Sequence, residues 1–175
     1  MNGSRPNGAE VLSLDLLPGE VEVLRSLVGQ LRRLVDAPAP SDDPLDNWAA
    51  EAAALPLDHE DPVIRRLFPG AYADADLDAE YRRLAEPGLR ADRDADARLV
   101  ERGLAGAAAG RVNVPRADVW AWLRTLNVLR LALAARLGIE DDDSLLGWIG
   151  PDDPRHALVQ TYCWLGYLLE SLLAA

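Results

Sequence analysis

The sequence contains no lysine, a single cysteine and only two histidines. With Cys163 alone, the chain can form neither an internal disulfide nor a cysteine-based zinc site. The lack of lysine excludes the G-x-x-x-x-G-K-[ST] phosphate loop, and no serine lies in a G-x-S-x-G elbow. Nucleotide hydrolysis and nucleophilic catalysis therefore have little support, and a reducing cytoplasm is the expected compartment.

Long apolar runs are also missing. No window reaches roughly 18 uncharged apolar residues, which is the length needed to cross a bilayer. The first eight residues, MNGSRPNG, lack the apolar core of an export signal. We therefore expect neither export nor membrane insertion.

Acidic residues dominate the charge. There are 29 acidic residues and 18 arginines, which gives a net charge of −11. Because phosphate affinity depends on basic charge that releases counterions, we expect no unaided binding to nucleic acid. The basic region is residues 101–137, and its Arg116, Arg124, Arg130 and Arg136 scatter around a helix at 100° per residue.

The length of 175 residues and the 49% hydrophobic content predict one domain over residues 10–175, after a disordered tail of residues 1–9. Residues 11–16 and 111–115 alternate like short strands, and each is followed by an amphipathic stretch. A lone strand would leave its backbone unpaired, so we expect the two to form an antiparallel ribbon.

The remaining periodicity is helical. We predict a mainly α, single-domain bundle of five to seven helices together with that minimal two-stranded ribbon. The expected helices cover residues 20–35, 44–55, 61–67, 77–86, 88–107, 119–137 and 152–173, with a break at Pro87-Gly88.

The C-terminal helix is apolar almost all round. Its expected core stripe is Leu158, Tyr162, Leu165, Leu169 and Leu172. A helix of this kind must be buried on several sides, either by other helices or by a second subunit, so a homodimer is one possibility. Trp164 and Tyr167 are the candidate interface residues.

Cys163 lies on the same helix. The favoured interpretation is an inert, buried cysteine, because reactive thiols need an accessible and electropositive setting. Cys163 is nevertheless the candidate redox thiol, since a cysteine exposed in a dimer seam could pair with its copy.

Other polar groups give weak signals. His59 and His156 show no metal-binding spacing and are expected to be solvated or to cap helices. The carboxylates at residues 140–143 and 152–153 lack the pattern of a calcium loop. On the helix at 119–137, Asn127 and Arg130 lie near the apolar stripe. We expect Arg124, Asn127 and Arg130 to form a polar cluster with salt bridges, in which Arg130 is paired with a buried carboxylate.

Four blocks carry a resemblance over most of the chain: EVEVLRSLVGQL at 20–31, DPVIRRLFPGAY at 61–72, WLRTLNVLRL at 122–131 and YCWLGYL at 162–168. In this order they resemble the AosR-type family, an actinobacterial group long labelled as a domain of unknown function and named as oxidative-stress transcriptional regulators. The resemblance implies a cytoplasmic protein that acts on transcription through a sigma factor and RNA polymerase.

The resemblance also implies redox sensing through a cysteine pair, which this chain lacks. Family members are commonly encoded beside the ClpS protease adaptor, so a partner in Clp proteolysis with no transcriptional role is the alternative. We expect a non-enzymatic regulator that works by protein–protein contact, with no catalytic residue, metal or cofactor.

Overall fold

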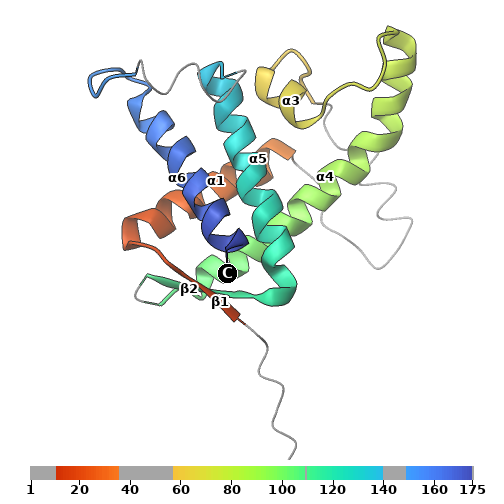
Figure 1. The fold of residues 1–175 in the computed structure, drawn as a ribbon. Helices are drawn as coiled ribbons and strands as arrows, with labels where there is room; N and C mark the ends of the chain where they lie inside the picture. The colour runs from red at the N-terminus through yellow and green to blue at the C-terminus, as the bar shows by residue number, and fades with distance from the viewer. Residues whose placement is uncertain (1–10, 36–56, 109, 140–148, 175) are drawn as a thin grey trace, which may run out of the picture.

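A computed structural model describes residues 11–35, 57–108, 110–139 and 149–174. The described part is mainly α, as predicted, and consists of helices packed above one small sheet (Figure 1). Helix α5 contacts α6, α3 and α4, while α1 packs against α4. The elements are β1 (Val11–Asp15), α1 (Pro18–Val35), α3 (Pro62–Leu67), α4 (Ala75–Ala105), β2 (Arg111–Pro115), a 3-10 turn (Arg116–Asp118), α5 (Val119–Leu137) and α6 (His156–Leu173).

The predicted antiparallel ribbon is confirmed. β1 and β2 pair in a register that sets Ser13 opposite Asn113. The alternating apolar residues Leu14, Val112 and Val114 turn inward to the core. The ribbon therefore joins the chain just before α1 to the chain just before α5.

Gly110 makes the ribbon possible. Its backbone has φ +83°, and its carbonyl accepts a hydrogen bond of 2.7 Å from the N–H of Leu16. A Cβ atom at Gly110 would lie 2.2 Å from the carbonyl oxygen of Leu16. Both the left-handed conformation and the close approach of the two backbones require glycine here.

The two long amphipathic stretches bury the expected stripes. In α1 the buried residues are Val21, Leu24, Val28, Leu31 and Val35. In α5 they include Trp122, Leu126, Leu129, Leu133 and Leu137. The close packing of α4 on α5 depends on Gly103, where a Cβ atom would lie 2.6 Å from the Trp122 ring.

The predicted break at Pro87-Gly88 is wrong, because α4 runs from Ala75 to Ala105 with Pro87 inside it. Proline removes one backbone hydrogen bond and crowds the preceding turn, which bends a helix without always ending it. Arg83, whose carbonyl loses that bond, is exposed to water. Figure 1 shows that the outer and inner halves of α4 point in different directions.

A polar network fastens α1 to the inner half of α4. The buried carboxylate of Asp94 accepts hydrogen bonds from Arg32 (2.8 Å) and from Arg98 (2.5 Å), and Arg32 also reaches Glu101 at 2.6 Å. Four residues before Asp94 on α4, Arg90 is buried and donates to the carbonyl of Val35 at 2.5 Å, at the end of α1. These contacts satisfy charges that would otherwise be costly to bury.

Helix α6 differs from its prediction in start and in phase. It begins at His156, because Asp152 and Asp153 belong to a preceding turn. Its buried residues are Val159, Tyr162, Leu165, Leu168 and Leu172. Leu158, expected in the core, is exposed, and Leu169 is half-buried.

Several predictions fall outside the described residues. These are the tail at 1–9, the helix at 44–55 and the acidic cluster at 140–143. Among the described residues, no helix has the length and apolarity that crossing a membrane requires.

Candidate interaction surfaces

A groove with a volume of about 580 Å3 lies between α4 and α5. Leu31 of α1 contributes to its wall, so the groove lies where three helices meet. The polar residues that line it are Asp92, Arg93 and Asp96 from α4 and Arg124, Thr125 and Asn127 from α5. Two of the three residues predicted as a polar cluster, Arg124 and Asn127, therefore lie in this groove.

Arg124 forms a two-pronged salt bridge across the groove. Its Nε donates to one carboxylate oxygen of Asp96 at 2.6 Å, and its second nitrogen donates to the other oxygen at 2.7 Å. The hydrogen bonds that Arg124 donates to the Asp96 carboxylate hold the pKa of Arg124 above its ordinary value. This geometry fixes both side chains and joins α4 to α5.

Arg93 lies at the edge of the same groove and is also engaged. It donates to the carbonyl of Leu67 at 2.5 Å, and its guanidinium carbon lies 4.3 Å from the centre of the Phe68 ring. Desolvation lowers the pKa of Arg93. Both arginines that line the groove, Arg93 and Arg124, are therefore engaged in contacts within the protein.

Arg130 does not join Arg124 and Asn127. Its guanidinium carbon lies 4.4 Å from the centre of the Tyr162 ring, on the side of α5 that faces α6. Each three-residue step on a helix rotates the side chain by about 60° backwards, so two steps take Arg130 well away from Arg124. The three residues therefore serve two different helix contacts.

The outer face of α6 consists of Gln160, Cys163, Tyr167 and Glu170, all of which are exposed. Tyr167 has an exposed fraction of 66%, and Trp164 beside it is half-buried against the core. The favoured interpretation of Cys163 as a buried cysteine is therefore wrong in the monomer. Within the described part of the chain, the bundle core covers one side of α6, whereas the apolar composition of this helix predicted that several of its sides are buried.

The histidines make side-chain contacts of their own. His59 is half-buried and lies 2.9 Å from a carboxylate oxygen of Glu86. The expectation that His59 is solvated or caps a helix is therefore wrong. His156 lies 2.9 Å from the side-chain nitrogen of Gln160. No group of three or more metal-ligating side chains that could hold an ion occurs in the described ranges.

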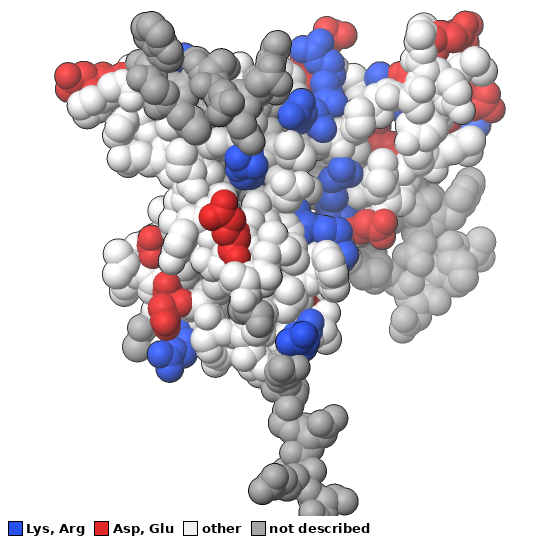
Figure 2. Space-filling model, in the orientation of Figure 1, with Lys and Arg blue, Asp and Glu red and all other residues white. Residues whose placement is uncertain are grey.

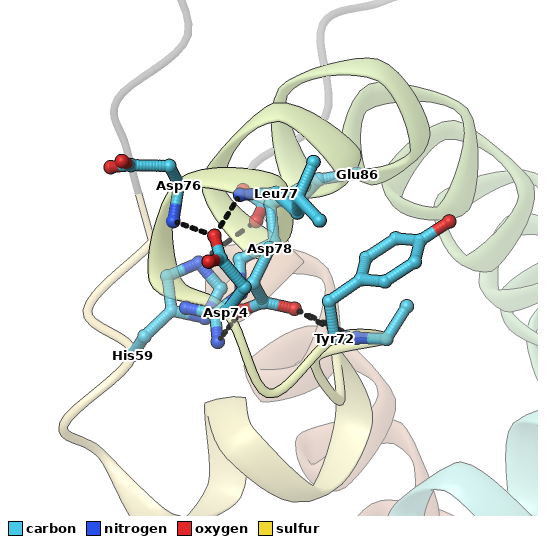
Figure 3. A network of polar contacts seen from close by, with 9 residues as sticks. His59, Tyr72, Asp74, Asp76, Leu77, Asp78 and Glu86 are labelled. Carbon is cyan, nitrogen blue, oxygen red and sulfur yellow. Dashed lines mark hydrogen bonds and ion pairs between the residues drawn. The ribbon is translucent and has the colours of Figure 1, made fainter.

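The outer half of α4, residues 75–89, extends away from the bundle and is called the α4 arm below (Figure 1). Acidic side chains lie at its outer end (Figure 2). Figure 3 shows the polar contacts around the start of the arm, at its outer end, where Asp74 caps the helix by accepting from the N–H groups of Asp76 and Leu77 at 3.0 Å each.

Comparison with known proteins agrees with the resemblance in the sequence. The model of the domain of unknown function DUF2017 matches residues 1–175. The chain belongs to the DUF2017 family. A Mycobacterium bovis protein and a Mycobacterium tuberculosis protein, each named oxidative stress regulator AosR, are 30% identical to it over 184 residues, which cover 90% of this chain and 78% of each relative. No solved structure matches the chain significantly.

Sequence reasoning missed two features of this DUF2017 member. The acidic residues of α4 that line the groove, Asp92 and Asp96, were not foreseen. Asp96 is 28 residues from Arg124, and no local pattern connects the two. The α4 arm was also missed, although Leu77 and Leu84 are spaced seven apart among acidic residues. That spacing, which places two leucines on one helical face, was the available signal.

Proposed function

We propose that this DUF2017 member is a cytoplasmic, non-enzymatic regulator of the oxidative stress response that acts through contact with a sigma factor and RNA polymerase. The names of its relatives support the regulatory role. The net charge of −11 favours action through a protein partner and disfavours solitary binding to DNA.

The observation that carries the proposal is the outer face of α6. Tyr167 is 66% exposed there, next to the half-buried ring of Trp164 and the exposed thiol of Cys163. Within α6, Glu170 is the one carboxylate, and the helix contains no arginine. Aromatic residues are enriched and charged residues are depleted at the centre of protein interfaces.

The polar groups of the α4–α5 groove fit the same proposal. Asp96 is held by the two-pronged salt bridge with Arg124, and Arg93 is bound to the carbonyl of Leu67. A general acid or base needs a free group with its pKa tuned near neutrality. These side chains instead fix the positions of α4 and α5, so the groove supports a scaffold that presents surfaces.

The proposal is tested by purifying the tagged protein from its own cells, with and without peroxide, and identifying what accompanies it by mass spectrometry. We expect subunits of RNA polymerase and a sigma factor with the wild type and a reduced yield with Tyr167→Ser. Trp120→Ser is the matched control, because Trp120 is an aromatic residue of nearly equal exposure at the start of α5. Recovery of ClpS or the Clp protease without polymerase would support the proteolytic alternative.

A further inference from the structure

The α4 arm contributes nothing apolar to the core. Among residues 75–89 only Asp78 is buried, and the buried apolar residues of α4 begin at Ala97. Isolated helices of about 15 residues are marginally stable in water, so a helical arm without core contacts needs another source of support.

Polar contacts supply that support (Figure 3). Asp78 accepts hydrogen bonds from the backbone N–H groups of Ala71 (2.7 Å) and Tyr72 (3.3 Å), and it pairs with Arg82 at 2.5 Å. His59 lies 2.9 Å from Glu86 near the other end of the arm. These polar contacts therefore hold the arm in place, and the side chains that make them do not pack into the apolar core.

The braced arm presents two leucines to solvent. Leu77 is 52% exposed and Leu84 is 67% exposed. A separation of seven residues corresponds to a rotation of only about −20°, so both leucines lie on one face. Glu80, three residues after Leu77 and four before Leu84, is exposed on that face as well.

Acidic residues outnumber arginines by five to two in residues 74–89, where Arg83 is the exposed arginine. Asp74, Asp76 and Glu80 are all exposed. Figure 2 shows acidic side chains at this outer end of the molecule. A second copy of the chain is a poor occupant, because it would bring two acidic arms together and repulsion would oppose the contact.

We propose that the α4 arm is a docking surface for a protein partner that offers an apolar depression bordered by basic side chains. The charge complementarity selects this occupant, and the rigid bracing lowers the entropy lost on binding. This inference rests on the proposed function and assigns the depression to the RNA polymerase holoenzyme. The arm lies on the opposite side of the bundle from α6, so it is a second contact (Figure 1).

The test is the affinity of the full chain, immobilised through an N-terminal tag, for RNA polymerase holoenzyme purified from its own cells. The variants are the double substitution Leu77→Ser with Leu84→Ser, and the charge reversal Glu80→Arg. Leu17→Ser is the matched control, because Leu17 is 69% exposed and lies outside the arm. All these side chains are exposed, so the thermal midpoints of the variants should match that of the wild type.

We expect the double substitution to weaken binding by about tenfold or more, as loss of an interface hot spot does. Glu80→Arg should weaken binding and reduce its dependence on salt, whereas Leu17→Ser should bind like the wild type. Equal binding by the wild type and both arm variants would overturn the assignment of the arm and leave the proposed function standing. Failure of the wild type to bind the holoenzyme would overturn the proposed function and this inference with it.

Discussion

Arg130 lies over the ring of Tyr162, with 4.4 Å between the guanidinium carbon and the ring centre, and this contact joins α5 to α6. The sequence predicted that Arg130 pairs with a buried carboxylate. The contact with Tyr162 explains why an arginine is tolerated beside the apolar stripe of α5, because a guanidinium is attracted to the face of an aromatic ring.

This contact predicts that Arg130→Ala lowers the free energy of unfolding by about 1–2 kcal/mol. Because Arg130 makes further interactions, a double-mutant cycle with Tyr162→Leu isolates the pair. The expected coupling is about 0.5–1 kcal/mol by urea unfolding. A coupling of zero would show that the two side chains stabilise the fold independently.

At Thr125, replacement by valine is expected to leave the free energy of unfolding unchanged or to raise it. The residue is 2% exposed, and its hydroxyl finds no hydrogen-bond partner among the residues that the structure describes. Thr125→Val has the same shape and removes an unsatisfied buried group, so the free energy of unfolding should stay equal or rise by about 1 kcal/mol. Thr125→Ser keeps the hydroxyl and loses a methyl group, and it should cost about 1 kcal/mol. A large loss with Thr125→Val would reveal a hydrogen bond in solution.

Two glycines with positive φ predict different costs. Gly110→Ala combines the left-handed conformation with a clash against the carbonyl of Leu16. Gly138, at the end of α5, has φ +70° with nothing within 4 Å of a Cβ atom. Thermal unfolding should therefore show a loss of about 1 kcal/mol for Gly138→Ala and a clearly larger loss, about 2–4 kcal/mol, for Gly110→Ala. Equal losses would contradict the close approach at the ribbon.

Asp78 predicts a dependence of stability on acid pH. Desolvation alone would raise the pKa of Asp78, but the N–H groups of Tyr72 and Ala71 and the charge of Arg82 outweigh it, so the pKa is lowered. A carboxyl group with a lowered folded pKa stabilises the fold above its unfolded pKa, and this contribution is lost as pH falls through the folded pKa.

The window for this loss begins near the ordinary pKa of 3.8 and extends below it. Urea unfolding between pH 2 and pH 6 should show a smaller dependence on pH for Asp78→Asn than for the wild type. The amide side chain can still accept a hydrogen bond from a backbone N–H but does not titrate. Parallel pH profiles for the two proteins would contradict the role given to this carboxylate.

Cys163 is predicted to react with thiol reagents in the folded protein, because its side chain is exposed on the outer face of α6. One equivalent of a chromogenic disulfide reagent should be consumed without denaturant, and Cys163→Ser should consume none. Reaction only after unfolding would mean that a copy or another segment covers this face. A non-reducing gel after peroxide tests the disulfide between subunits, and monomer alone would exclude it.

Much of the fold could be predicted from the sequence in those segments where apolar and polar residues alternate with a clear period. The alternation at residues 11–16 and 111–115 predicted both strands and their pairing, and the apolar stripes of α1 and α5 were correct in phase. In α6 almost every position is apolar, so periodicity could not decide which side faces the core. That ambiguity caused the errors at Leu158 and Cys163.

The candidate surfaces were less predictable because they depend on contacts between distant segments. Local pattern placed Arg124 on a helix but could not supply Asp96 as its partner. Pro87 suggested a break, although the polar contacts that brace the arm sustain one continuous helix on both sides of it. The Arg124–Asp96 salt bridge and the continuous helix through Pro87 depend on contacts between distant segments, which local secondary-structure propensity does not report.

Regulation through RNA polymerase is tested most directly by transcription in vitro with purified RNA polymerase, the sigma factor recovered with the protein, and a promoter that this sigma factor recognises. We expect the wild-type chain to change the transcript yield and the Leu77→Ser, Leu84→Ser variant to do so only weakly. The chain alone should not shift the promoter DNA in a gel. An unchanged yield at every concentration of the chain, or a shift of the DNA by the chain alone, would contradict the proposed function.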